Sequence, residues 1–199
     1  MRGSGEKMKH VISKDIEFCF GHRVHCQVLD AEFSIDTRCC CRHCHGHQGA
    51  VKIVFEAEQL NAQQMVVDFK ATNWLRQFID EYIDHRFIID THDPLYNRFA
   101  DGSFGLNPVF IEGVVKPVGY RLDLGDDTAC YPIDDPARCV IEGVDREWYE
   151  SFFVVDFCPT SENLSKWIYG FASEKMARLA KVVQVDWCET PKTRASYCR

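Results

Sequence analysis

Apolar and polar residues alternate in the first part of the chain. Between residues 11 and 22 the even-numbered positions are mostly apolar, whereas the odd-numbered positions include Ser13, Asp15 and Glu17. A period of two is typical of a strand with one buried face. His22 therefore falls at the end of a predicted strand, on its inward face.

The same alternation returns twice. Residues 45–58 place His45 and His47 on one face with a run of apolar residues, and lysine and glutamate on the other. Residues 182–189 place Glu189 at the end of a predicted strand whose same face is apolar. A carboxylate on such a face is costly unless it is paired. Glu189 either accepts N–H bonds from a guanidine-like ring edge or simply ends the strand.

Two stretches predict helices. Apolar side chains recur at three-four spacing in residues 71–85, which predicts a helix with Asp84 and His85 at its end. Residues 151–157 predict a short apolar strand. The segment Pro159–Glu162 then begins a second helix, because hydroxyl residues followed by an acid are typical of a helix N-terminus.

The remaining parts of the chain lack a clear period. Residues 23–44 are dense in Cys, Arg and Asp and predict a loop or an irregular hairpin. Residues 92–150 are punctuated by Pro and Gly-Asp-Asp steps, with short apolar runs at Val109–Ile111 and Val114–Val115 that indicate strands. A connection of this length is unusual inside a compact domain. We therefore expect one domain over residues 1–199 with an insertion at about 92–150.

Composition limits the class of protein. The chain has 199 residues, 46% hydrophobic and 27% charged, and a formal net charge of −7. These values are typical of one globular domain, and an acidic chain argues against nucleic acid as the main partner. No stretch of about 18 apolar residues predicts a membrane span. The chain opens without the apolar core of a secretory signal and has eleven cysteines, an odd number, so we expect reduced thiols and a cytoplasmic location.

The pair His45-Gly46-His47 is the strongest local sign of metal binding. Residues two apart in a strand point the same way, so both imidazoles can reach one ion. His22, at the inward end of another strand, is the best candidate for a third ligand. Three histidines with an open fourth position are typical of catalytic zinc, although imidazole also suits copper, nickel or iron.

A second metal hypothesis uses sulfur. Cys39, Cys40, Cys41 and Cys44 cluster before His45, and Cys41 and Cys44 form a C-x-x-C pair. Such pairs often mark a structural zinc site, but no second C-x-x-C follows in the chain. On this hypothesis the zinc stabilises a scaffold without catalytic activity.

Further residues suggest proton transfer. Cys41 lies four residues before His45, so a turn would bring its sulfur near a metal ligand, where a thiolate can act as a base. Asp84 and His85 form a candidate relay if the backbone bends between them. The alternative for His85 is a helix C-terminus, where a histidine favours the helix dipole.

Six blocks, taken in order, resemble the 6-pyruvoyltetrahydropterin synthase family, including its bacterial branch, the 6-carboxytetrahydropterin synthases. The order of the six blocks is far more specific than any one of them, and they cover roughly residues 11–91 and 151–197. The blocks are Phe18–Arg23, Cys41-x-x-x-His45-Gly46-His47, Met65–Phe69, Asp84–Phe87, Pro159–Asn163 and Glu189-Thr190.

The resemblance implies an α+β tunnelling fold, or T-fold. This fold has a four-stranded antiparallel sheet with two helices on one face, here with a long insertion between the second helix region and the third strand. Family members are usually homohexamers, joined edge to edge, with active sites between subunits.

The resemblance also implies roles for individual residues and a substrate, 7,8-dihydroneopterin triphosphate. The zinc ligands would be His22, His45 and His47. The catalytic groups would be Cys41, Asp84 and His85, and the substrate-binding residues Glu189, Thr160 and Ser161.

The resulting hypothesis is a zinc-dependent lyase of the bacterial branch. It would convert the substrate to 6-carboxytetrahydropterin, acetaldehyde and triphosphate, for a 7-deazaguanine pathway such as queuosine biosynthesis. The alternatives are a 6-pyruvoyltetrahydropterin synthase, which stops before side-chain cleavage, an aldolase-like variant that acts on dihydroneopterin, and the scaffold stabilised by zinc.

Overall fold

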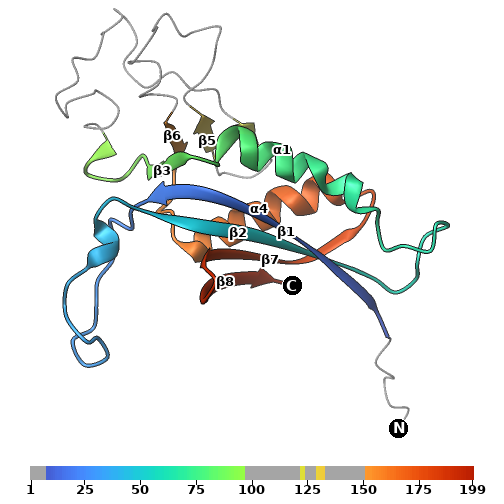
Figure 1. Cartoon of the computed structure of the whole chain (residues 1–199), viewed down its shortest axis with the longest axis horizontal. Helices are drawn as coiled ribbons and strands as arrows, with labels where there is room; N and C mark the ends of the chain where they lie inside the picture. The colour runs from blue at the N-terminus through green and yellow to red at the C-terminus, as the bar shows by residue number, and fades with distance from the viewer. Residues whose placement is uncertain (1–7, 97–121, 124–128, 133–150) are drawn as a thin grey trace, which may run out of the picture.

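The structure is a computed structural model that describes residues 8–96, 122–123, 129–132 and 151–199 (Figure 1). The strands are β1 (His10–His22), β2 (His45–Ala57), β3 (Arg86–Asp90), β4 (Leu122–Asp123), β5 (Ala129–Pro132), β6 (Phe152–Val155), β7 (Lys181–Thr190) and β8 (Thr193–Cys198). The helices are α1 (Asn73–Tyr82) and α4 (Ser161–Met176), and two short 3-10 turns are η1 (Cys40–Arg42) and η2 (Phe69–Thr72).

The described strands form one sheet in the order β4-β5-β6-β3-β1-β2-β7-β8. Strands β1, β2, β7 and β8 are antiparallel neighbours, while β3 pairs in parallel with β1 and with β6. The antiparallel group and the two helices are the parts of the predicted α+β T-fold, which is confirmed. Strands β3 and β6 then extend this sheet in parallel.

One core lies between the sheet and both helices. Helix α1 contributes Leu75 and Phe78, and α4 contributes Trp167, to the same buried cluster as the inward residues of β1, β2 and β7. The Phe78 ring lies 5.8 Å from that of Trp167, so the helices also contact each other on this side of the sheet. Figure 1 shows both helices running along the same side of the strands. Burying this face of large apolar side chains is the main force holding the layers together.

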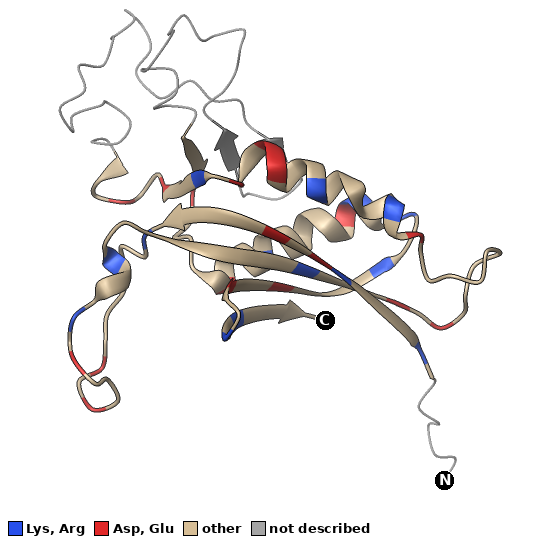
Figure 2. Ribbon diagram, viewed as in Figure 1, with Lys and Arg blue, Asp and Glu red and all other residues tan. Residues whose placement is uncertain are grey.

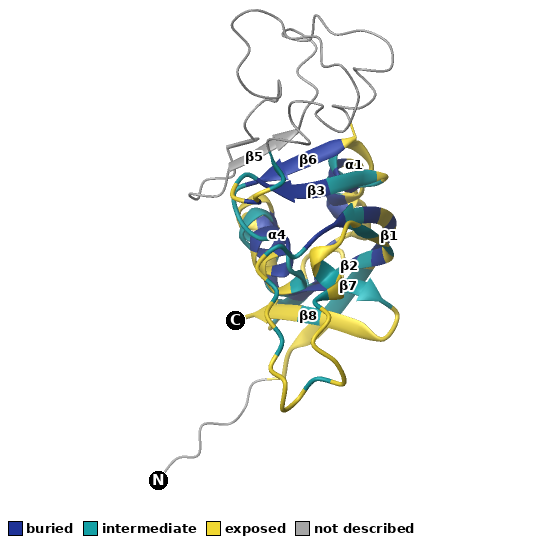
Figure 3. Cartoon of the chain, turned by 90° about the vertical axis from the view of Figure 1, so that its left-hand side faces the viewer, coloured by how far each residue is buried: buried dark blue, intermediate teal, exposed yellow. Residues whose placement is uncertain are grey.

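The burial of each strand explains whether its sequence pattern predicted it. Strands β3 and β6 are largely buried and β8 is mostly exposed (Figure 3). Neither β3 nor β8 was predicted, because a short strand covered on both faces and an exposed edge strand lack the alternation of a half-buried strand. The parity prediction for 182–189 holds at its end, but Val182 is buried rather than Val183. The pairing of β2 with β7 shifts between Val54 and Phe55, and this bulge moves the phase.

The predicted helix over residues 71–85 was too long. Helix α1 begins at Asn73, after the η2 turn, and ends at Tyr82. Asp84 and His85 lie in the turn that leads into β3, and His85 adopts a left-handed backbone with φ of 61°. The backbone therefore bends at this pair.

The two irregular stretches behave differently. Residues 23–44 form a loop with one 3-10 turn, as predicted, and Figure 1 shows this loop projecting from one end of the sheet. The insertion lies between β3 and β6 and therefore precedes the second helix, α4, so its predicted place between the second helix and the third strand was wrong. Strand β5 within it pairs with β6. The expected strands at Val109–Ile111 and Val114–Val115 lie outside the described residues. The single-domain organisation stays a prediction.

Charged residues of both signs are interspersed over the described elements (Figure 2). No basic stripe follows any of these elements, in keeping with the net charge of −7. Among the described residues, no helix has the length and apolar character to cross a membrane.

Candidate metal centre and active site

Strand pairing gathers the three candidate metal ligands at one end of β1 and β2. His22 pairs directly with His45, and His47 lies two residues further along β2 on the same face. The ring centroids of His22 and His45 are 4.7 Å apart, those of His22 and His47 5.2 Å, and those of His45 and His47 5.0 Å. One nitrogen of each ring lies within 4.8 Å of the others. The structure therefore brings together the three imidazoles that strand parity predicted.

Backbone carbonyls orient two of these rings. His22 Nδ1 lies 2.7 Å from the carbonyl oxygen of Pro159, and His45 Nδ1 lies 2.8 Å from that of His43. When Nδ1 carries the proton and donates to the carbonyl, Nε2 presents its lone pair to a metal, as is common for metal-bound histidine. No residue pattern signals the roles of Pro159 and His43, because the ring partners are main-chain atoms.

The cluster fits a metal ion. His22 is fully buried, and the Nε2 atoms of both His22 and His47 are buried without a hydrogen-bond partner in the described part of the chain. Such groups are rare in folded proteins and call for a ligand. Burial lowers the pKa of His22 to about 4 and also lowers that of His47, so both rings are neutral at pH 7 and able to bind a cation.

The sulfur-based alternative lacks such a site. Among the described residues, the three histidines are the one group of three or more potential ligands whose donor atoms gather within 4.8 Å. Cys39, Cys40, Cys41 and Cys44 do not come together in this way.

Aromatic packing supports the cluster from below. The Phe20 ring contacts His22, His47 and Trp187 at centroid distances of 5.2, 5.5 and 5.1 Å. A Cβ atom at Gly49 would lie only 2.7 Å from the Phe20 ring and 2.8 Å from the Cys188 carbonyl oxygen. Only glycine therefore allows Phe20 to lie across β2 beneath the histidines.

Glu189 brings a negative charge to the cluster. Its Oε1 lies 3.7 Å from His22 Nε2, and its side chain is 25% exposed. The carboxylate raises the pKa values of His22 and His47, although burial, the larger effect, lowers both. Glu189 thus lies where it can face a bound cation or the donor groups of a ligand.

The Asp84 carboxylate and the His85 imidazole lie in contact beside β1. Asp84 Oδ1 accepts from the backbone N–H of Cys19 at 2.8 Å, and its Oδ2 lies 3.0 Å from His85 Nδ1. The backbone N–H of His85 donates to the Cys19 carbonyl at 2.7 Å. The aspartate is thereby fixed to the strand, while the His85 side chain is 80% exposed. This arrangement leaves His85 Nε2 open to exchange a proton.

One surface hollow connects His85 with two of the candidate metal ligands. It is lined by His45, His47 and His85, together with Cys19 and Cys44. Cys41 does not line this hollow. A substrate in the hollow can therefore meet the exposed imidazole of His85 and the histidine cluster at once.

Cys41 lies in the η1 turn and is held through its backbone. Its N–H donates to Gln27 Oε1 at 3.0 Å, and its carbonyl oxygen accepts from the Val24 N–H at 2.7 Å. The thiol is half-buried and makes no hydrogen bond within the described residues. The expected turn is present, and the catalytic role of Cys41 stays a prediction. Sequence reasoning missed Gln27.

Thr160 and Ser161 lie at the start of α4. Thr160 is the N-cap residue, and its Oγ1 accepts from the Asn163 N–H at 3.3 Å. The predicted helix start is therefore confirmed. Substrate binding by these two residues stays a prediction.

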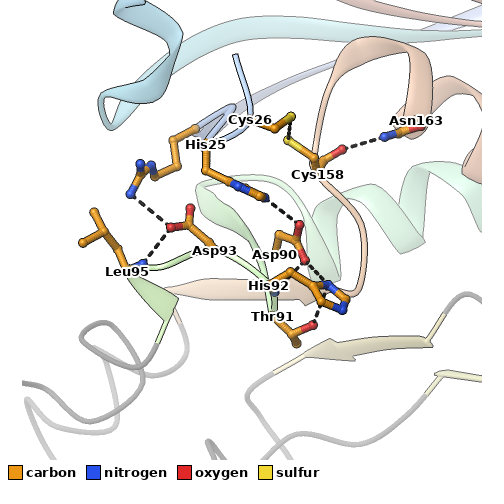
Figure 4. Close-up of polar contacts among 10 residues, drawn as sticks. His25, Cys26, Asp90, Thr91, His92, Asp93, Leu95, Cys158 and Asn163 are labelled. Carbon is orange, nitrogen blue, oxygen red and sulfur yellow. Dashed lines mark hydrogen bonds and ion pairs between the residues drawn. The ribbon is translucent and has the colours of Figure 1, made fainter. Parts of the chain in front are cut away.

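A further polar cluster lies beyond the end of β1 and was missed (Figure 4). Buried Asp90 accepts from His25 Nε2 at 2.8 Å and from His92 Nδ1 at 2.9 Å. Buried Arg23 donates to Asp93 at 3.1 Å. These residues come from the loop after β1, the last position of β3 and the turn after it, so no local spacing signals their contact.

Comparisons with known proteins bear on the family and the fold of the chain. Residues 11–199 match the family model described as 6-pyruvoyl tetrahydropterin synthase. The chain is 30% identical to the 6-carboxy-5,6,7,8-tetrahydropterin synthase of Aquifex aeolicus over 201 residues, which cover 96% of this chain and 98% of that protein. Among solved structures, an uncharacterized protein of Wolinella succinogenes is 38% identical, with a TM-score of 0.78 over 96% of this chain and 99% of that one. The Caenorhabditis elegans 6-pyruvoyl tetrahydropterin synthase shares the fold, with 18% identity and a TM-score of 0.51 over 96% of each chain.

Proposed function

Because this chain belongs to the 6-pyruvoyl tetrahydropterin synthase family, we propose that it is a 6-carboxytetrahydropterin synthase. It converts 7,8-dihydroneopterin triphosphate and water to 6-carboxytetrahydropterin, acetaldehyde and triphosphate. The observation that carries this proposal is the cluster of His22, His45 and His47, with Glu189 beside it and His85 in the adjoining hollow. The name of the Aquifex relative supports this product.

Zinc is the ion we propose for the three histidines, because three imidazoles with an open fourth position suit catalytic zinc. When bound, zinc would polarise the side-chain oxygens of the substrate and make the neighbouring carbon-bound protons more acidic. The unpartnered, buried Nε2 atoms of His22 and His47 are the structural support for this ion.

Cys41 is the proposed base that removes a carbon-bound proton from the substrate side chain. The proposed relay is His85, which exchanges that proton at Nε2 while Asp84 holds its Nδ1. The Asp84 contact with the Cys19 backbone supports this assignment, because it keeps the relay at a fixed place on the sheet. Elimination of triphosphate follows proton removal, and cleavage of the side chain completes the reaction.

Glu189 is the proposed anchor of the pterin ring, whose guanidine-like edge offers two N–H donors to one carboxylate. Thr160 and Ser161, at the N-terminus of α4, are proposed to contact the substrate as well. Their place directly after Pro159, whose carbonyl contacts His22, supports a position close to the metal centre.

We also propose that the active protein is a homo-oligomer, a hexamer as in the resembled family, and that it acts in the cytoplasm in 7-deazaguanine biosynthesis such as that of queuosine. The loop 23–44 supports assembly, because Val28, Phe33 and Ile35 are large apolar side chains that are at least 83% exposed. Such a surface is typical of a subunit contact. A contact there would also place the Cys41 turn between subunits.

Product analysis tests the proposed reaction. Zinc-loaded protein is incubated with 7,8-dihydroneopterin triphosphate, and the products are identified by mass. We expect 6-carboxytetrahydropterin and acetaldehyde in equal amounts. Accumulation of 6-pyruvoyltetrahydropterin without acetaldehyde would favour the alternative in which elimination is the last step. Zinc-loaded protein that leaves the substrate unchanged would refute both reactions and favour the scaffold.

A further inference from the structure

Two cysteines far apart in the chain meet beside the metal centre. The sulfur atoms of Cys26 and Cys158 lie 3.1 Å apart, although 132 residues separate them. Cys26 lies in the loop after β1 and Cys158 directly before α4, and Figure 4 shows their side chains pointing toward each other. Both are separate from the Cys39–Cys44 group. The proposed reaction uses neither thiol.

We propose that Cys26 and Cys158 form a reversible disulfide that closes the chain around His22. The closed path runs from His22 along the chain to Cys26, across the sulfur–sulfur bond to Cys158 and Pro159, and back to His22 through the contact with the Pro159 carbonyl. Cys26 follows His22 by four residues, and Cys158 precedes Pro159, whose carbonyl oxygen lies 2.7 Å from His22 Nδ1. A sulfur–sulfur bond would therefore link the chain that leaves His22 to the acceptor that orients its ring.

The partner in this exchange is a small disulfide of the glutathione class. The exposed Cys26 thiolate attacks a sulfur of the oxidised partner, forming a mixed disulfide and releasing one thiolate. Cys158 then gives up its proton and attacks the Cys26 sulfur, which expels the second thiolate. The two cysteines lose two electrons and two protons in total, and the partner gains them as two reduced thiols.

The surroundings assign the order of these steps. Burial and the neighbouring Cys26 raise the pKa of Cys158 to about 12, so its half-buried sulfur is protonated at neutral pH. Cys26 is exposed and is the sulfur that an oxidant can reach first. Asn163 Nδ2 donates to the Cys158 carbonyl at 2.9 Å, which fixes the backbone of Cys158 to α4. Cys158 is thus placed to resolve a mixed disulfide on Cys26.

The expected consequence is slower loss of the metal ion and a more stable fold. The hydrogen bond from a metal-binding histidine to its acceptor typically changes metal affinity by roughly 10–100-fold. A disulfide that fixes both sides of this bond should slow zinc release by about tenfold. It should also raise the melting temperature by roughly 5–15 °C, because it cross-links distant parts of the chain. The effect on zinc rests on the proposed metal centre, whereas disulfide formation does not.

Trypsin digestion allows a direct test with the full chain. Residues 24–38 and 147–166 are tryptic peptides that contain Cys26 and Cys158, respectively, as their single cysteines. Zinc-loaded protein is treated with oxidised glutathione, alkylated and digested, and melting temperature and zinc release to a chelator are measured in parallel. The variants are Cys26→Ser and Cys158→Ser, and the matched control is Cys198→Ser, an exposed cysteine on β8.

We expect a linked 24–38/147–166 peptide in the wild type and in Cys198→Ser, and its disappearance in both other variants and after dithiothreitol treatment. Failure to form the link while Cys26 becomes glutathionylated would overturn the proposal. A link that forms without slowing zinc release would overturn the coupling to His22. The wild type is compared with Cys158→Ser under the same oxidant, so changes that arise from Cys39–Cys44 appear in both proteins. Pterin turnover is assayed separately, so its absence would count against the proposed function alone.

Discussion

The three histidines of the candidate metal site and the Cys41 thiol are held in different ways, although Cys41 and His45 lie only four residues apart in the chain. Residues in the paired strands β1 and β2 place the imidazoles, and two backbone carbonyls orient His22 and His45. Cys41 lies in a loop and is held through its own N–H and carbonyl, with no hydrogen bond to its thiol in the described residues.

This difference indicates that separate parts of the site serve cation binding and proton transfer. A cation needs donor atoms at fixed mutual distances, which a strand register supplies without substrate. Proton transfer needs groups that reach the reacting carbon only when substrate is bound, and catalytic contacts often tighten at that stage. The exposed His85 ring and the loop-held Cys41 fit the second requirement. The comparison therefore predicts that strand residues control metal content and loop residues control turnover.

The largest effect should come from His45→Ala. It removes a donor from the strand-held cluster, so we expect zinc affinity to fall beyond the roughly 10–100-fold caused by losing a hydrogen-bond partner of a ligand. Pterin turnover should become undetectable with it. Metal analysis after dialysis against a chelator measures the first effect. The matched control is Gln48→Ala, one residue beyond His47 on β2 with an exposed side chain, which should keep its zinc. Equal zinc content in His45→Ala and Gln48→Ala would contradict the prediction that the histidines on the strands control metal content.

Cys41→Ala should separate the two regions. Turnover should fall by roughly 10²–10⁴-fold, the usual contribution of a general base, while zinc content stays at the wild-type level. Cys44→Ala is the informative partner, because Cys44 lines the same hollow as His45 whereas Cys41 does not. If Cys44→Ala loses turnover and Cys41→Ala retains it, then Cys44 is the base and the Cys41 thiol is not part of the reaction.

The parts of the fold that the sequence predicted are those with one buried face. Strands β1 and β2 each have thirteen residues and alternate in burial, so their parity also predicted the histidine cluster. Strand β8 is exposed at almost every position and left no such pattern. The phase of β7 was misjudged near Val183 because a bulge depends on pairing with β2, which sequence periodicity does not contain.

Contacts between loops account for the rest of what was missed. The bond between Gln27 and Cys41 spans 14 residues, that between His25 and Asp90 spans 65, and the Cys26–Cys158 contact spans 132. Sequence periodicity predicts which face of a single helix or strand is buried. These contacts instead depend on where the ends of separate elements lie relative to one another in the folded chain. The Asp84–His85 pair was found because the two residues are adjacent, but its bond to Cys19 was not.

Asp84→Asn tests the proposed relay and should have an effect on turnover that is intermediate among these predictions. The amide oxygen can still accept from the Cys19 N–H, so the fold should stay intact. The amide nitrogen cannot accept from His85 Nδ1, so we expect turnover to fall by about a hundredfold, with an altered pH profile and unchanged zinc. Asp80→Asn, on the exposed side of α1 and paired with Arg76, is the control and should leave turnover within about twofold, as is usual for surface substitutions. Equal losses in the two variants would assign Asp84 a role in stability alone.

Gln27→Ala should have the smallest effect, because Gln27 acts on Cys41 only through the backbone. Its Oε1 is the acceptor for the Cys41 N–H, and losing it should loosen the η1 turn and lower kcat by about tenfold, since small displacements of a catalytic group are costly. KM and zinc content should not change, because neither the hollow nor the histidine cluster contains Gln27. Gln27→Glu keeps an acceptor oxygen at the same reach and should restore most of the lost kcat. If Gln27→Ala and Gln27→Glu lose kcat equally, or if zinc content falls together with kcat, then the loop does not position the Cys41 thiol. In that case the proposed contrast between metal ligands held by strands and a base held by a loop is wrong for the base.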